Sequence, residues 1–317
     1  MRLAVSIAIA LLTASAHAQN YPSRAVRMLV PFPPGGGTDI VARVIGQKLS
    51  ELWAQPVIMD NRPGGTTVLA AEIVAKSSPD GYTLFVTPVP FSIVPSLQPR
   101  LPFDPVADFE PIALFNTAPL VFIVNPRVPA KSIKELIALA RTKPGVLNFG
   151  SSGTGSSNHL AGELFNAMAG VKITHIPYKG SPPALIDLAG GHVDLAVTTV
   201  PSALALITGG KVRALAVTSM KRSATLPDVP TMNESGLKGF EADGWNGVSA
   251  PARTPKDIVN KINADVAKIL RMPDVLEKFR SEGVEPAAMT PAEFGAFFRN
   301  EIAKWGKVIK LAGVKPL

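Results

Sequence analysis

Two short glycine-rich loops contain the residues whose types and spacing best suit binding chemistry. The first spans residues 35–38, and the second, at residues 152–156, adds serine and threonine hydroxyls to its glycines. Each loop follows an apolar run and precedes a helical pattern. The first N–H groups of a helix have no partner within it, and the helix dipole leaves partial positive charge there. Because glycine also permits a sharp turn and close approach of a ligand, each loop is a candidate anion site.

Motifs for catalysis, metals and nucleotides are missing from the sequence. Residues 35–39 are not followed by Gly-Lys-Ser/Thr, and residues 153–155 lack the third glycine of a dinucleotide loop. After an N-terminal signal is removed, His159, His175 and His192 remain, and none is spaced from another like shared metal ligands. No Gly-x-Ser-x-Gly elbow surrounds the serines of the second loop. We therefore predict no catalytic residue, metal or cofactor, and His159 has two interpretations, a ligand contact or a packing residue.

The elements that must position these loops alternate between β-rich runs and amphipathic stretches, which is typical of an α/β protein. Strands are predicted at residues 26–31, 56–59, 83–87, 120–124, 147–150, 173–177, 193–197 and 212–218. Helices are predicted at residues 40–52, 133–140, 160–168, 258–270 and 294–309. The last of these carries a long apolar seam, so we expect a C-terminal helix docked on the core.

The strand, glycine-rich loop and helix occur once in each half of the chain, which predicts two lobes with a ligand cleft between them. Crossings between the lobes are expected near residues 120–124 and 245–250. Lobe 1 then comprises residues 19–119 and 247–317, and lobe 2 comprises residues 120–246. A carboxylate held by one loop and contacted by the other would keep the lobes together.

The N-terminus predicts export. Arg2 provides a positive start, residues 3–12 form a short apolar run, and Ala16-His17-Ala18 is a small-x-small cleavage site. The apolar run is too short to span a bilayer. Residues 1–18 are therefore expected to be a signal peptide cleaved after Ala18, and the mature protein is expected to be periplasmic.

Composition narrows the classes of partner. The chain has no cysteine, which excludes disulfides, thiolate metal sites and a lipid anchor. Its net charge of +8 is not concentrated in clusters interleaved with aromatic residues, which make up 6% of the chain. That pattern does not indicate nucleic-acid binding, and it leaves a mild attraction for anions. No later segment predicts membrane insertion, and we expect a monomer.

Beyond these patterns, the sequence resembles the Bug family, the extracytoplasmic receptors of tripartite tricarboxylate transporters. The resemblance covers nearly the whole mature chain. It rests on ordered blocks at residues 30–39 (VPFPPGGGTD), 61–65 (NRPGG), 78–84 (SPDGYTL), 178–181 with 184–185, 201–203, 213–218 (RALAVT) and 226–231 (LPDVPT). It implies a two-lobed, type II-like periplasmic-binding-protein fold, in which each lobe is a mostly parallel or mixed sheet flanked by helices. It also implies a receptor that delivers its ligand to membrane permease subunits.

The resemblance further implies that a ligand carboxylate meets the backbone of the first loop, partly through bridging waters, with the second loop opposite. Carried onto this chain, it points to ten residues: Pro34, Gly35, Gly36, Gly37, Thr38, Ser152, Thr154, Gly155, Ser156 and His159. We add Thr87 and Thr198, which lie where this chain departs from its relatives.

The two departures bear on the ligand. Family members often carry Asp-Asn where this chain has Thr198 and Thr199, and that Asp can receive an ammonium group. A buried ammonium without a carboxylate partner is costly, so amino acids are expected to be poor ligands and a mono- or dicarboxylate without an amine is preferred. Relatives tend to have small, flexible residues at positions 87–91, where this chain reads TPVPF, and its prolines and Phe91 are expected to wall off the cleft or stack on an aromatic acid.

Two other functions stay open at this point. An exported hydrolase or transferase acting on a carboxylated substrate would need a nucleophile–base pair or a metal constellation, and the sequence supplies neither. A sensing receptor for a two-component system would bind its ligand by the same physics as a transport receptor.

Overall fold

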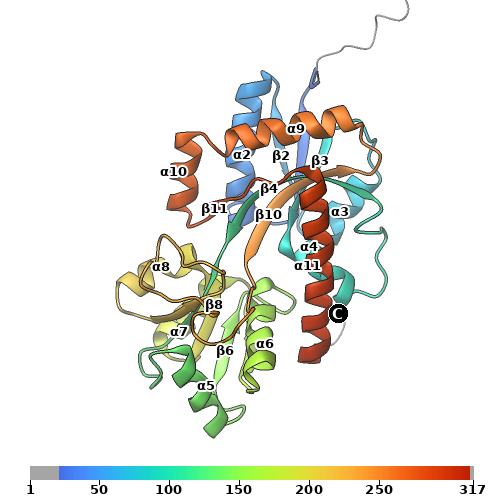
Figure 1. Cartoon of the computed structure of the whole chain (residues 1–317). Coiled ribbons are helices and arrows are strands. Elements are labelled where there is room, and N and C mark those ends of the chain that lie inside the picture. Colours follow the sequence, from blue (N-terminus) through green and yellow to red (C-terminus); the bar gives the residue numbers. More distant parts are fainter. Residues whose placement is uncertain (1–20, 315–317) are drawn as a thin grey trace, which may run out of the picture.

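The computed structural model describes residues 21–314, which form two β-sheets with helices packed on both faces of each (Figure 1). This arrangement confirms the predicted α/β fold. The predicted signal peptide, residues 1–18, lies outside the described residues. Within the described range, no helix is both long and apolar enough to cross a membrane.

The first sheet has six strands in the order β11-β4-β10-β3-β1-β2. Its strands are β1 (Val26–Val30), β2 (Val57–Asn61), β3 (Thr83–Pro88), β4 (Phe109–Ala118), β10 (Gly244–Pro251) and β11 (Glu285–Pro286). Strand β1 pairs in parallel with β2 and β3, whereas β10 runs antiparallel between β3 and β4 and β11 is antiparallel to β4. The parallel part therefore presents the carboxyl ends of β1 and β3 at one edge, where ligands usually bind.

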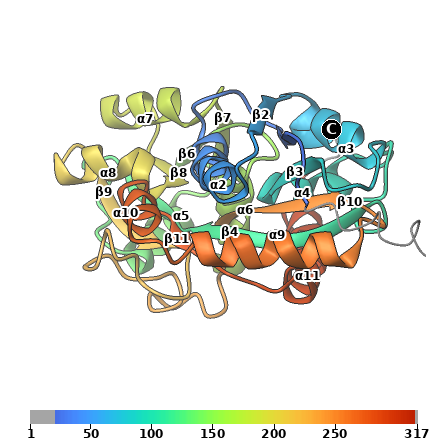
Figure 2. The same ribbon diagram turned by 90° about the horizontal axis from the view of Figure 1, so that it is seen from above.

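Two sets of helices cover this first sheet, because alternate strand residues point to opposite faces. Met28 packs in one apolar cluster with α2 (Gly37–Trp53), α9 (Lys256–Ile269) and α10 (Pro273–Ser281). The next residue, Leu29, packs in the other cluster with α3 (Val68–Ala75), α4 (Val89–Leu97) and α11 (Pro291–Ala312). The short 3₁₀ turn η1 (Gly65–Thr67) precedes α3. Seen from above, α9 lies along β4 on the side of the sheet opposite to α3 (Figure 2).

The second sheet has five strands in the order β7-β6-β8-β5-β9. Its strands are β5 (Leu120–Val124), β6 (Asn148–Ser151), β7 (Thr174–Pro177), β8 (Leu195–Thr199) and β9 (Arg213–Val217). Strands β7, β6 and β8 are parallel, and β5 is antiparallel to β8 and β9. Helices α5 (Ile133–Thr142) and α6 (Ser157–Ala169) cover one face, and α7 (Ser181–Gly190) and α8 (Val200–Thr208) cover the other.

The chain passes between the two sheets twice. It leaves the first sheet after Ala118 and enters the second at Leu120, and it returns in the segment between Thr218 and Gly244. The crossings, expected near residues 120–124 and 245–250, directly precede strands β5 and β10. The predicted lobe limits at 119/120 and 246/247 stay predictions; below, lobe 1 and lobe 2 mean the first and second sheets with their helices.

The C-terminal helix α11 begins with a capping box, in which Thr290 and Glu293 exchange side-chain to backbone hydrogen bonds, and Pro291 opens its first turn. It packs against α4 and β4 of lobe 1 and also against α6 of lobe 2 (Figure 1). One apolar cluster therefore continues from the first lobe into the second through this helix.

Candidate functional site

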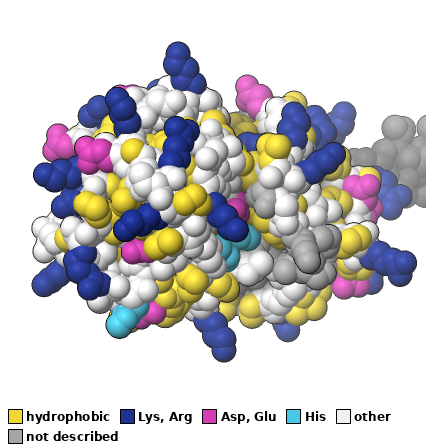
Figure 3. Space-filling model, turned by 90° about the horizontal axis from the view of Figure 1, so that it is seen from below, with side chains coloured by type: hydrophobic (Ala, Val, Ile, Leu, Met, Phe, Trp, Pro, Cys, Tyr) yellow, Lys and Arg dark blue, Asp and Glu magenta, His cyan; other side chains and the backbone are white. Residues whose placement is uncertain are grey.

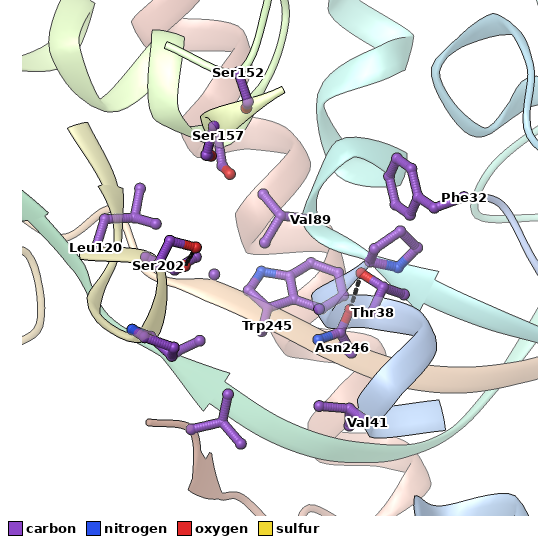
Figure 4. A pocket seen from close by; sticks show the side chains of 18 of the residues that line it. Phe32, Thr38, Val41, Val89, Leu120, Ser152, Ser157, Ser202, Trp245 and Asn246 are labelled. Atoms are coloured by element: carbon purple, nitrogen blue, oxygen red, sulfur yellow. Dashed lines mark hydrogen bonds between the residues drawn. The ribbon is translucent and has the colours of Figure 1, made fainter. Parts of the chain in front are cut away.

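A cavity of about 420 Å³ lies where the helix starts of the two lobes meet. Its lining residues are Phe32, Gly35, Gly37, Thr38, Ile40, Val41, Pro88, Val89, Pro90, Ala118, Leu120, Ser152, Ser156, Ser157, Asn158, Ser181, Thr199, Pro201, Ser202, Gly244, Trp245, Asn246, Glu282 and Val284. Ser152 and Ser157 of lobe 2 face Val89 and Thr38 of lobe 1 across this space (Figure 4). Both lobes thus contribute to one site.

The starts of five helices in the described chain contribute to the lining: α2 and α4 from lobe 1, and α6, α7 and α8 from lobe 2. Each of these helices follows a strand, so the cavity sits at the carboxyl ends of the strands in both sheets. Unpaired N–H groups and the positive ends of helix dipoles therefore converge on the cavity. This arrangement suits an anion.

The first glycine loop is held from behind by Asp39. Its carboxylate accepts hydrogen bonds from the Gly35 N–H at 2.9 Å, from Arg43 Nε at 2.7 Å and from the Asn61 amide at 2.8 Å. Burial alone would raise the pKa of Asp39, but these hydrogen bonds, Arg43 first, hold the pKa below its ordinary value. Asp39 does not line the cavity and is occupied in shaping the loop, as expected for a carboxylate in the first turn of a helix.

Three of the five residues predicted in this loop line the cavity: Gly35, Gly37 and Thr38. Gly35 has a left-handed φ of 82°, which favours glycine there. The Thr38 hydroxyl donates to Asn246 Oδ1 at 2.8 Å, which ties the start of α2 to β10 (Figure 4). Pro34 and Gly36 belong to the same turn but do not line the cavity.

The second loop brings Ser152 and Ser156 to the cavity, whereas Thr154 and Gly155 do not line it. Ser156 is the N-cap of α6: its hydroxyl accepts from the His159 N–H at 3.2 Å and donates to the Gly153 carbonyl at 2.7 Å. This cap fixes the loop and directs the start of α6 at the cavity.

His159 lies beneath this loop, buried, and does not line the cavity. Its Nδ1 accepts the Gly155 N–H at 3.2 Å, and its ring stacks on His175 with centroids 3.9 Å apart. Burial, and then the neighbouring His175, lower the pKa of His159 to about 3, and burial lowers the pKa of His175 to about 4. Of its two interpretations, the packing residue is the one that matches this position.

One serine–histidine pair that the sequence did not reveal is present in this network. Ser151 Oγ and His175 Nε2 share a hydrogen bond of 2.6 Å. However, Ser151 is buried at the end of β6, its hydroxyl also contacts the Gly153 backbone, and neither residue lines the cavity. The pair supports the loop and presents no nucleophile to a ligand.

Thr87, Thr198 and Phe91 are placed differently from the expectation. Thr87 is 1% exposed and its hydroxyl shares a 2.9 Å hydrogen bond with Ser249, and Thr198 is 2% exposed; neither lines the cavity. Phe91 is 1% exposed and stacks on Phe298, with ring centroids 5.3 Å apart, so it neither walls the cleft nor meets a ligand there. The expectation for Phe91 was wrong, because α4 turns this side chain into the core of lobe 1.

Several lining residues were not predicted. Some occupy further helix starts, and a proline in the first turn of α4, α7 and α8 is a sequence signal that marks such starts. Others come from β10, where Trp245 forms an apolar wall and Asn246 meets Thr38 (Figure 4). No local pattern identifies these, because β10 joins the site only through the fold.

The charges around the cavity are few. None of its lining residues within 21–314 is Lys or Arg, and Glu282 is the one acidic residue among them. In the same range, no group of three His, Asp or Glu side chains is arranged to hold a metal ion. On the face of the molecule in Figure 3, Lys and Arg side chains are scattered singly and form no basic patch.

Two α/β lobes that enclose a shared cavity with their helix starts define the class of periplasmic binding proteins. The chain belongs to the tripartite tricarboxylate transporter receptor family, whose sequence model matches residues 41–314. The resemblance to Bug proteins is thereby confirmed.

Three relatives illustrate the membership. The protein BugT of Bordetella pertussis is 38% identical over 315 residues, which cover 99% of this chain and 97% of BugT. The solved structure of Rpa4515 from R. palustris with adipate is 40% identical, has a TM-score of 0.83, and the match covers 94% of this chain and 100% of that one. MatC from Rhodopseudomonas palustris with bound malate is 33% identical with a TM-score of 0.77, and the match covers 91% of this chain and 100% of that one.

Proposed function

We propose that this protein is an exported receptor that captures a small organic carboxylate and presents it, chemically unchanged, to the permease of a tripartite-type transporter. The observation that carries the proposal is the convergence of helix starts from both lobes on one cavity, where none of the described lining residues is a lysine or arginine. Two relatives that were solved with adipate and malate support carboxylate as the ligand class.

The chemistry of capture follows from the groups at the cavity. Backbone N–H groups at the start of α2, at Gly37 and Thr38, donate hydrogen bonds to a ligand carboxylate, directly or through waters. Hydroxyls of Ser152 and Ser157 meet it from lobe 2. Because the ligand then contacts both lobes, its binding favours the closed arrangement over the open one.

The residues that line the cavity also limit which groups the ligand can carry besides its carboxylate. Apolar side chains such as Phe32, Val89 and Trp245 suit a hydrocarbon middle. Glu282, the one acidic residue among the described residues that line the cavity, is paired with Lys278 at 2.6 Å, so an ammonium group on the ligand would have to share this counter-charge with Lys278. A mono- or dicarboxylate without an amine therefore remains the preferred class.

Export completes the proposal. Removal of residues 1–18 after Ala18 would release a periplasmic monomer. The description of the family as a transporter receptor supports a membrane permease as the partner.

A thermal-shift screen of organic acids tests the proposal, since a ligand that binds only the folded protein raises its unfolding temperature. We expect at least one mono- or dicarboxylate to raise it, and the matching amino acid to do so less. Prolonged incubation followed by mass analysis should return the ligand unchanged. Absence of any shift across the acids, or conversion of the ligand, contradicts the receptor function.

A further inference from the structure

Glu282 is the single acidic residue among the described residues that line the cavity. It is the C-cap of α10, so the negative end of that helix dipole and a carboxylate coincide at one end of the cavity. The side chain is 28% exposed. This end is therefore negative, whereas the helix starts elsewhere around the cavity are positive.

The neighbouring contacts place this negative end beside α8. A Cβ on Gly283, the residue after Glu282, would lie 2.8 Å from Cγ of Pro201, so the two backbones are packed closely. Pro201 and Ser202 form the first turn of α8 and line the cavity with Thr199. The start of α8 thus lies beside the residue that follows Glu282, whereas Gly35, Gly37 and Thr38 line the cavity at the start of α2.

The carboxylate of Glu282 has capacity for a further hydrogen bond. Within residues 21–314 its one hydrogen bond from another side chain is from Lys278 Nζ to Oε1 at 2.6 Å. Lys278 is half exposed, so water also hydrates its ammonium group and weakens its interaction with Glu282. A carboxylate whose charge is partly balanced in this way accepts a hydroxyl donor well, but it repels a second carboxylate that loses its own hydration.

We infer that Glu282 makes this receptor selective for carboxylates whose far end is an uncharged hydrogen-bond donor, such as a hydroxyl, over dicarboxylates of the same length. The inference rests on the proposed function and specifies the ligand class of the same cavity. The ligand carboxylate occupies the side formed by the starts of α2 and α6, and the hydroxyl donates to Glu282 beside α8.

Titration calorimetry with three acids of equal chain length tests this. Adipate, 6-hydroxyhexanoate and hexanoate differ only at the far end, and the trio is shortened or lengthened to the chain length that the organic-acid screen selects. We expect the wild-type protein to bind the hydroxy acid roughly tenfold more tightly than the dicarboxylate, the ratio that corresponds to one modest like-charge interaction. In Glu282→Gln the dicarboxylate should gain affinity, so that the ratio approaches one.

Glu277→Gln is the matched control, because Glu277 is exposed on the same helix and does not line the cavity. It should keep the wild-type ratio. A ratio in Glu282→Gln equal to that of the wild type, or a wild-type preference for the dicarboxylate, overturns the role of Glu282 while leaving the receptor function intact. Failure of every acid to bind the wild-type protein refutes the receptor function itself, and with it this inference.

Discussion

At the scale of single residues, Gly37 shows how main-chain groups are made available to a ligand. It lines the cavity as the first residue of α2, and a Cβ built on it would have no atom within 4 Å. A Cβ there therefore meets open space beside the cavity and clashes with no described protein atom.

Gly37→Leu is accordingly expected to weaken binding of the best carboxylate by roughly tenfold or more, because the side chain fills space that the ligand needs. The unfolding temperature of the ligand-free protein should stay within about 2 °C of the wild type, since surface substitutions without new clashes change stability little. Calorimetric titration and thermal unfolding measure the two effects.

Gly295→Ala serves as the comparison, because its added methyl would make ordinary contacts on α11 away from this cavity. It should bind the carboxylate like the wild type. Equal affinities for Gly37→Leu and the wild type would show that the ligand does not approach the start of α2.

Asp243 is a second residue whose environment has a measurable consequence. It lies just before β10, where the chain returns to lobe 1, and it accepts a 2.8 Å hydrogen bond from the Thr218 hydroxyl. Burial is the main cause that raises its pKa to about 6; Glu241 and Glu301 add to the rise, while Thr218 and Lys304 oppose it. The ionised carboxylate is therefore held at a cost in the folded protein.

Because the folded pKa exceeds the unfolded one, Asp243 destabilises the protein at neutral pH, and this cost fades as the pH falls through about 6 towards 4. Asp243→Asn keeps the acceptor for Thr218 and removes the charge. It should be more stable than the wild type by about 3 kcal/mol at pH 7 and by much less at pH 4. Urea unfolding across this range checks the difference, and a difference independent of pH contradicts it.

Residue types predicted the loops better than they predicted individual contacts. Glycine and serine before a helix identified Gly35, Gly37 and Ser156, because helix starts require such residues. Thr87 was misplaced since β3 pairs with β10 and turns that hydroxyl towards Ser249. Which side of a strand faces a cavity is decided by its partner strand, and the local sequence does not contain that information.

At the scale of elements, the unit formed by β6, its loop and α6 depends on the stacked pair His159 and His175. Both are uncharged in the folded protein, since burial lowers the pKa of each to about 3 and about 4, respectively. The unfolded chain binds protons at these groups from about pH 6.5 downwards. The contribution of the two neutral histidines to the free energy of unfolding is thus fully present above about pH 6.5 and is lost as the pH falls towards 4.

The histidine pair therefore lowers the stability of the folded protein as the pH falls, whereas the Asp243 contribution raises it. In the Asp243→Asn background, where the opposing contribution is absent, stability should fall by about 2 kcal/mol or more between pH 7 and pH 5. Adding His175→Gln should make that fall roughly half as steep, since glutamine does not titrate while buried His159 still does. Urea unfolding at the two pH values measures the change, and an equally steep fall after the substitution would exclude the pair as its cause.

Amphipathic elements were predictable from sequence, and elements without a polar face were not. The spacing of apolar residues located α2 and α11, because one face of each helix is buried and the other is exposed to solvent. By contrast, α4 is buried at six of its nine positions, with Pro95 inside it, so its helical period was not visible. Strand β4 carries Pro111 and was also missed, although it pairs with β10 along most of its length.

At the scale of the whole molecule, α11 joins the lobes through a shared core. Glu301, buried on this helix, accepts the indole N–H of Trp245 at 2.9 Å and that of Trp305 at 3.0 Å. Trp245 lines the cavity, and the same apolar cluster includes Phe165 on α6. The lobes are thus connected by packed side chains as well as by the two crossings of the chain.

We therefore expect ligand-free protein to unfold in one cooperative transition, with equal calorimetric and van 't Hoff enthalpies. Trp305→Phe loses one donor to Glu301 and some packing, and it should lower the midpoint of that single transition without splitting it. Two separate transitions in differential scanning calorimetry would show that the lobes are independent.

The repetition of strand, glycine-rich loop and helix, once in each half of the chain, predicted two lobes with a cleft between them. The bridging position of α11 was not predictable, since its apolar seam indicates burial but not against which lobe. Trp245 and Glu282 reach the cavity only because distant segments return to it, so the sequence did not identify them.

The central claim is that helix starts and hydroxyls hold a carboxylate, with no basic side chain among the described residues that line the cavity. The most direct test compares the affinity of the best carboxylate ligand with that of its primary amide. The amide keeps the size and shape of the acid and removes its charge. By titration calorimetry the acid should bind roughly a hundredfold more tightly than the amide, as charge-assisted hydrogen bonds to a buried anion require. Equal affinities for the two would contradict the claim.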